Sequence, residues 1–135
     1  MNDTAQRLAE AFVTMLNEHD PDLVDTFVAS DYRNHNVFVD DGREANRRFW
    51  TGFFTALPDL TATMEDLVVS GDRVVGRFVY RGTHRGEIFG VAPTGKMIAY
   101  AGAAFFRIAD GKVAEGWVLG YLLSLLRQLG AQKLP

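Results

Sequence analysis

The chain has 135 residues, which is enough for one domain and too few for a second independent core. Its formal net charge of −3 comes without a basic stripe, which argues against a nucleic-acid partner because phosphate binding needs clustered Lys and Arg. The absence of cysteine excludes disulfides, thiol nucleophiles and thiolate metal sites. Neither a signal peptide nor an apolar run of membrane-spanning length (about 18 residues) is recognisable, so we expect a cytoplasmic protein that does not enter a membrane.

Helical patterns fill the first half of the chain. Apolar residues recur at helical spacing over residues 8–16, and Asp3 or Thr4 is available to cap this first helix. A second helix is expected to begin after Asp20, which precedes a proline, and to end near Val28. These two segments predict a pair of N-terminal helices.

A polar segment and a third helix follow. Residues 30–41 show no periodic pattern and are expected to be irregular. Residues 43–57 carry apolar aromatic side chains at helical spacing, and Pro58 ends this helix.

The second half of the chain is rich in strand patterns. The expected strands span residues 61–69, 73–84, 96–108 and 112–119. Asp110-Gly111 is typical of a hairpin turn between the last two strands. A short helix over residues 121–129, ended by Gly130, closes the chain. Helices followed by antiparallel strands predict an α+β domain, and a strongly bent sheet around the helices leaves a cleft at one end.

Short motifs recur in a fixed order along the sequence. They are Tyr32-Arg33-Asn34-His35, Pro58-Asp59-Leu60, Gly71-Asp72-Arg73-Val74-Val75, Gly82-Thr83-His84-Arg85-Gly86, Phe89-Gly90, Pro93-Thr94-Gly95-Lys96, Phe106-Arg107-Ile108, Asp110-Gly111-Lys112-Val113, Trp117 and Arg127-Gln128-Leu129-Gly130. In this order and spacing the chain resembles the SnoaL-like polyketide cyclase family of the nuclear-transport-factor-2-like superfamily, over nearly its whole length. The resemblance implies one cone-shaped α+β domain, residues 1–135, in which a curved antiparallel or mixed sheet wraps N-terminal helices and a C-terminal helix follows.

The resemblance also shows where this chain departs from the cyclases. The aspartate that the family places on the last strand falls on Val118, and the histidine of the neighbouring strand falls on Ala104. Another polar pocket position falls on Gly102, and an aspartate common before the final helix is replaced by Tyr121. Of the expected polar set only the asparagine remains, as Asn34. The usual acid/base pair is therefore missing.

Three residues are candidates for a substitute catalytic set. His35 suits a general base, because an unperturbed imidazole titrates at about pH 6.5. Tyr121 suits hydrogen-bond donation to a carbonyl better than base catalysis, since an ordinary phenol titrates at about pH 10. In this hypothesis Asn34 and Tyr121 orient the carbonyl and His35 moves a proton.

Small residues on the last two strands predict a wide, apolar pocket. Gly102, Ala104, Gly116, Val118 and Gly120 share the strand parity of the family's inward positions. An empty void would cost about 24 cal/mol per Å³, so neighbouring side chains, water or a ligand must fill this space. The residues expected to contact a ligand are Tyr32, Trp50, Phe54, Arg77, Tyr100, Gly102, Ala104, Phe106, Trp117 and Val118. Whether Arg77 faces inward or outward stays open at this point. Glu115, of opposite parity to Val118, is expected to face away from the pocket.

Two function classes fit this pattern. The first is a cofactor-independent cyclase, isomerase or lyase acting on a small apolar, carbonyl-bearing, polyketide-like molecule. The second is a hydrophobic ligand-binding protein without chemistry, and an engineered or repurposed pocket scaffold is a third possibility. The histidines at 19, 35 and 84 lack paired spacing, so neither a metal nor another cofactor is expected. By resemblance we expect a homodimer formed through the outer sheet face, which a monomeric mass in light scattering would contradict.

Overall fold

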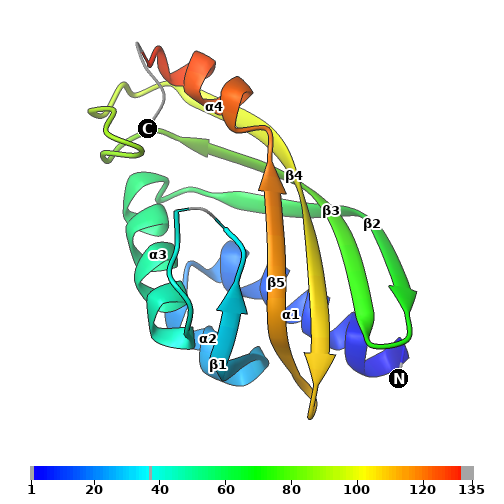
Figure 1. Cartoon of the computed structure of the whole chain (residues 1–135). Coiled ribbons are helices and arrows are strands. Elements are labelled where there is room, and N and C mark those ends of the chain that lie inside the picture. Colours follow the sequence, from blue (N-terminus) through cyan, green and yellow to red (C-terminus); the bar gives the residue numbers. More distant parts are fainter. Residues whose placement is uncertain (1, 37, 132–135) are drawn as a thin grey trace.

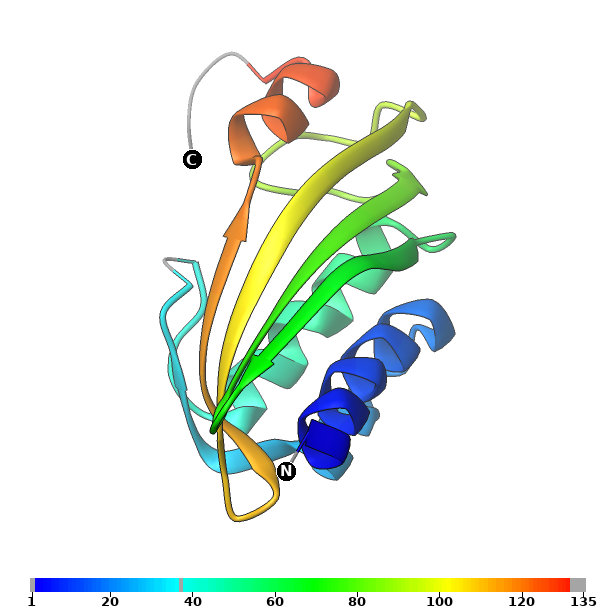
Figure 2. The ribbon, with the colours of Figure 1, turned by 90° about the vertical axis from the view of Figure 1, so that its right-hand side faces the viewer.

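A computed structural model describes residues 2–36 and 38–131. It consists of one sheet with helices on one of its faces (Figures 1 and 2). The helices are α1 (Asn2–Glu18), the 3-10 turn η1 (Pro21–Leu23), α2 (Val24–Phe27), α3 (Arg43–Ala56) and α4 (Leu122–Leu129). The strands are β1 (Val28–Asn34), β2 (Thr61–Ser70), β3 (Arg73–Thr83), β4 (Met97–Ala109) and β5 (Lys112–Gly120).

The sheet has five strands in the order β1-β5-β4-β3-β2. All neighbours are antiparallel except β1 and β5, which run parallel. Figure 2 shows that the sheet curves around α1 and α3, while α4 lies at its far end. The predicted α+β class, with a curved mixed sheet around N-terminal helices and a C-terminal helix, is therefore confirmed. Among the described residues, no helix has both the length and the apolar character needed to cross a membrane.

Local signals in the sequence set several element ends. Asp110 (φ 51°) and Gly111 (φ 75°) form the turn between β4 and β5, as expected of a tight hairpin. Gly130, at φ 75°, ends α4 in the left-handed conformation that favours glycine. The expected cap of α1 is wrong, because this helix already begins at Asn2 and Asp3 therefore lies within its first turn.

The prediction of an irregular segment over residues 30–41 is also wrong in its first part. Residues 28–34 form β1, which pairs in parallel with β5 and buries Val28 and Tyr32. The second helical segment, η1 followed by α2, begins after Asp20 and ends at Phe27, one residue before the expected end near Val28. The pattern was hard to recognise because the strand is short and Ser30, Asp31 and Arg33 on it are exposed.

The core is organised around Phe12 of α1. Its side chain is only 3% exposed. Four aromatic rings surround it edge-on, with centroids 5.3, 5.6, 5.7 and 6.5 Å away, and they belong to Phe78, Phe106, Trp50 and Phe27 respectively. Such edge-to-face contacts add to the stabilisation that apolar burial supplies. Phe12 thereby joins α1 to α3 and to the concave face of the sheet.

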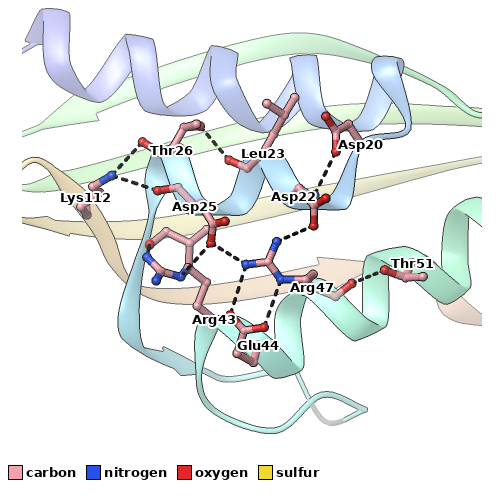
Figure 3. A network of polar contacts seen from close by, with 11 residues as sticks. Asp20, Asp22, Leu23, Asp25, Thr26, Arg43, Glu44, Arg47, Thr51 and Lys112 are labelled. Atoms are coloured by element: carbon pink, nitrogen blue, oxygen red, sulfur yellow. Dashed lines mark hydrogen bonds and ion pairs between the residues drawn. The ribbon is translucent and has the colours of Figure 1, made fainter.

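An arginine on α3 fixes this helix against the segment that precedes β1. Arg47 donates to Asp22 at 2.7 Å, to Asp25, and to Glu44 one turn earlier on its own helix at 3.1 Å (Figure 3). Hydrogen bonds to these carboxylates raise the pKa of the Arg47 guanidinium above its ordinary value. The network holds α3 in place and so positions the aromatic side chains that this helix directs at the sheet.

Candidate functional site

A cavity of about 260 Å³ lies between the concave face of the sheet, α3 and α4. The loop after β1 and the loop between β3 and β4 complete its wall. Its lining residues are His35, Asn36, Phe38, Phe49, Trp50, Phe53, Tyr80, Phe89, Tyr100, Gly102, Val118, Leu119, Gly120, Leu122 and Leu125. Most of these side chains are apolar or aromatic, so the cavity suits a small apolar molecule.

Two tyrosines bring polar groups to this apolar wall. Tyr80 of β3 and Tyr100 of β4 are directly opposed in the sheet, and their ring centroids are 5.0 Å apart. Neither phenol oxygen has a hydrogen-bond partner among the described residues, and neither is among the fully enclosed side-chain atoms of those residues that lack such a partner. Burial raises the pKa of both phenols above the ordinary value, so both stay protonated near neutral pH.

Glycines beneath the aromatic rings give them room. A Cβ on Gly102 would lie 3.2 Å from Cε2 of Tyr80, and a Cβ on Gly120 would lie 3.9 Å from Cε2 of Tyr100. Gly116, four residues before Gly120 on β5, likewise has an aromatic side chain above it, that of Tyr32. Part of the space that small residues were expected to leave is therefore filled by tyrosine rings.

His35 lies at the edge of the cavity and is held by groups of the outer sheet face. Its Nε2 is 2.6 Å from Oε2 of Glu115, and its ring stacks on Trp117 with centroids 4.5 Å apart and planes 1° from parallel. Glu115 also accepts from Nε of Arg107 at 2.9 Å. The hydrogen bond from His35 and that from Arg107 lower the pKa of Glu115 from its ordinary 4.5 to about 2. An ionised Glu115 can only accept, so it selects the tautomer in which Nε2–H of His35 donates this hydrogen bond and the ring lone pair is on Nδ1.

The lowered pKa of Glu115 predicts a specific acid sensitivity. A carboxyl of this kind stabilises the fold above its unfolded pKa, and this contribution is lost as the pH falls through the folded value. We therefore expect the unfolding midpoint in urea to fall more steeply in wild type than in Glu115→Gln between pH 4.5 and about 2. Asp66→Asn, which removes an exposed carboxylate, is the control. Parallel pH curves for wild type and Glu115→Gln would contradict the assignment.

Five of the residues expected in the site lie on the cavity wall. They are His35, Trp50, Tyr100, Gly102 and Val118. Four others are buried without forming part of that wall. They are Tyr32, Phe54, Ala104 and Phe106. Each of the four packs into the core that supports the cavity, and their contact with a ligand stays a prediction.

The remaining predicted site residues lie away from the cavity wall. Arg77 is more than half exposed and pairs with Asp66 at 2.6 Å, so it faces outward. Trp117 also lies on the outer sheet face, between His35 and Arg73. Tyr121 is 67% exposed and stands outside the cavity wall.

Asn34 takes part in hydrogen bonds within the loop that follows β1. Its Oδ1 accepts from the backbone N–H of Asn36 at 3.0 Å, which forms an Asx turn. Its own N–H donates to Asp41 at 2.7 Å. These bonds shape the loop that carries His35, and Asn34 itself is not part of the cavity wall.

Sequence reasoning missed much of the actual wall. The missed residues are Asn36, Phe38, Phe49, Phe53, Tyr80, Phe89, Leu119, Leu122 and Leu125, whereas Gly120 had the parity expected of the pocket. Tyr80 was recoverable in principle, because it has the parity opposite to that of Arg77. Its inward direction follows once Arg77 is known to face solvent.

The described residues contain no group of three or more His, Cys, Asp or Glu side chains that could hold a metal ion. The lining residues include one histidine, His35, and no carboxylate, and their other polar side chains are Asn36 and the phenols of Tyr80 and Tyr100. The site is equipped to bind an apolar molecule, to donate hydrogen bonds and to move a proton at its edge.

The curved sheet around the N-terminal helices, with an apolar cavity on its concave face, is the architecture of a nuclear-transport-factor-2-like fold. The family model for the SnoaL-like polyketide cyclases matches residues 6–129, and the chain belongs to this family. A comparison with the curated proteins gave no match.

Solved structures agree with this assignment. TsrD from Streptomyces laurentii is 35% identical, with 97% of this chain and 98% of that chain covered and a TM-score of 0.91. IdmH from Streptomyces antibioticus is 29% identical, with 94% and 99% covered and a TM-score of 0.78. A SnoaL-like polyketide cyclase from Agrobacterium tumefaciens is 21% identical, with 93% and 98% covered and a TM-score of 0.78, which supports the fold alone.

Proposed function

We propose that the chain is a cofactor-independent enzyme of the cyclase or isomerase type, acting on a small apolar carbonyl-bearing molecule held in the cavity. The observation that carries the proposal is the cavity of about 260 Å³, with aromatic walls and a histidine at its edge. Aromatic walls favour a cyclic or polyketide-like substrate, because flat rings stack on them and lose little conformational freedom.

The proposed chemical step is proton abstraction next to the carbonyl. The C–H bond breaks, its electron pair forms the enolate, and the proton passes to Nδ1 of His35. The imidazolium then forms beside the ionised carboxylate of Glu115, whose negative charge stabilises it. Family acid/base positions do not contribute, since Val118 and Ala104 stand there. Positioned base catalysis of this kind is worth roughly 10² to 10⁴ in rate.

Hydrogen exchange of a simple ketone tests this step. In D₂O with 2-acetylnaphthalene, we expect the protein to speed deuterium uptake into the methyl group, followed as a mass gain. His35→Ala should slow this uptake by about 10²-fold or more. Val118→Phe, which fills the cavity wall, should also suppress it, whereas Leu123→Phe on the exposed side of α4 should not. Equal uptake in wild type and His35→Ala would reject the role of His35.

A non-catalytic ligand-binding protein is the second candidate. It is favoured by the absence of a carboxylate from the cavity wall, where the family's cyclases have an aspartate. In that case the ketone quenches the fluorescence of Trp50 in a Trp117→Phe background, Val118→Phe weakens this quenching, and no exchange above the buffer rate occurs. The same experiment therefore distinguishes binding with chemistry from binding alone.

Assembly and location are further proposals. We infer a homodimer formed through the outer sheet face, because three apolar side chains are exposed on it at 42–62%. They are Val68, Phe105 and Leu119, the last of which also borders the rim of the cavity. A cytoplasmic location is the expectation that follows from the sequence.

A further inference from the structure

The cavity contains a pair of hydroxyl groups that the catalytic proposal does not use. Tyr80 and Tyr100 project from directly opposed positions of β3 and β4, and their rings are tilted by only 31°. Both side chains belong to the cavity wall, although Tyr80 as a residue is 5% exposed. A polar group placed this deep in an apolar wall normally has a hydrogen-bond partner.

No such partner is present among the described residues. An unpaired hydroxyl in an apolar site costs free energy unless water or a ligand supplies the missing bond. Neither oxygen is among the fully enclosed atoms that lack a partner, and both residues line the cavity, so we take the cavity as the side from which a partner reaches them. The ligand is therefore the natural source of an acceptor.

We propose that the Tyr80 and Tyr100 hydroxyls together form a binding site for one oxygen of the ligand, a ketone or enolate oxygen on an otherwise apolar, cyclic molecule. The two rings lie side by side on one wall of the cavity with their centroids 5.0 Å apart, and in the proposed site each hydroxyl donates a bond of about 2.7 Å to the same ligand oxygen. This inference rests on the proposed function, and it moves the carbonyl-orienting role from Asn34 and Tyr121 to the two strand tyrosines.

Because both phenols are protonated, the pair favours a ligand that carries a hydrogen-bond acceptor. Burial raises the pKa of both phenols, so each can donate at neutral pH. A donor pair in an apolar wall favours an oxygen that carries partial or developing negative charge. It discriminates against an isosteric hydrocarbon, because that ligand leaves both hydroxyls unpaired.

The glycines beneath the pair support the same conclusion. Gly102 and Gly120 are opposed on β4 and β5, and no side chain on either competes with the rings. A Cβ at Gly102 would also lie 3.0 Å from the carbonyl oxygen of Leu119. The two glycines thus leave space on the sheet surface next to the rings of Tyr80 and Tyr100.

A matched pair of ligands tests the inference. 2-Acetylnaphthalene and 2-isopropenylnaphthalene have the same shape, but only the ketone has an oxygen acceptor. By calorimetry we expect wild type to prefer the ketone. The double variant Tyr80→Phe/Tyr100→Phe should lose about three- to tenfold of this preference for each hydroxyl. Tyr32→Phe, a buried phenol outside the cavity wall, is the control and should keep the preference.

Infrared spectroscopy supplies a readout that does not depend on a variant. The carbonyl stretching band of the bound ketone should lie at lower wavenumber in wild type than in the double variant. Equal binding of both ligands to wild type, with no band shift, would overturn the tyrosine site while leaving an apolar cavity intact. Failure of both ligands to bind would instead overturn the proposed function and the inference that rests on it.

Discussion

Replacing Phe12 with alanine is expected to lower the free energy of unfolding by about 3–5 kcal/mol. The buried ring contacts aromatic side chains from α3 and from β3 and β4. Its removal therefore leaves a cavity where α1, α3 and the sheet pack together. Rigid rings around the gap can move into it only partly, which places the expected cost in the upper part of the range for core truncations.

Urea unfolding followed by far-UV circular dichroism measures this loss. A typical domain is stable by about 5–15 kcal/mol, so the variant should unfold at a much lower urea concentration, with an unchanged slope if the unfolded states are alike. Phe38→Ala is the matched control, because that ring is 43% exposed and its removal should cost much less. If both variants lose similar stability, Phe12 does not have the central position described above.

Sequence patterns predicted the layers well because each element contained its own signals. The turn at Asp110-Gly111 and the helix end at Gly130 depend on backbone conformations that few residues adopt, so they are visible without tertiary information. β1 contained no comparable signal. Its place in the sheet depends on parallel pairing with β5, a contact between residues far apart in the sequence.

The candidate site was harder to predict because its wall depends on strand register. β3 and β4 are joined by the long segment 84–96, so no tight turn reveals that Tyr80 lies opposite Tyr100. The family comparison identified Gly102 correctly as a wall position but suggested empty space there. The ring of Tyr80 occupies part of that space, and only the three-dimensional arrangement shows which large side chain complements each small one.

Gly116 provides the sharpest test of this pairing between glycines and tyrosines. A Cβ at this position would overlap the hydroxyl oxygen of Tyr32 and lie 3.0 Å from its Cζ and 3.2 Å from Cδ1 of Phe106. Alanine reduces the freedom of the unfolded chain, which alone would stabilise the fold by about 0.4–1 kcal/mol. Tyr32 is buried and cannot turn into solvent, so overpacking should win and Gly116→Ala should cost about 1–3 kcal/mol.

A double-mutant cycle separates this clash from a general intolerance of side chains on β5. Removing the hydroxyl with Tyr32→Phe should restore part of the stability that Gly116→Ala loses, because the overlapping atom is then absent. Gly120→Ala, on the same strand and with its nearest neighbour 3.9 Å away, should be neutral or slightly stabilising. Additive effects in the cycle would show that Tyr32 does not occupy the space above Gly116. The same logic would then weaken the placement of Tyr80 above Gly102, on which the proposed oxygen site depends.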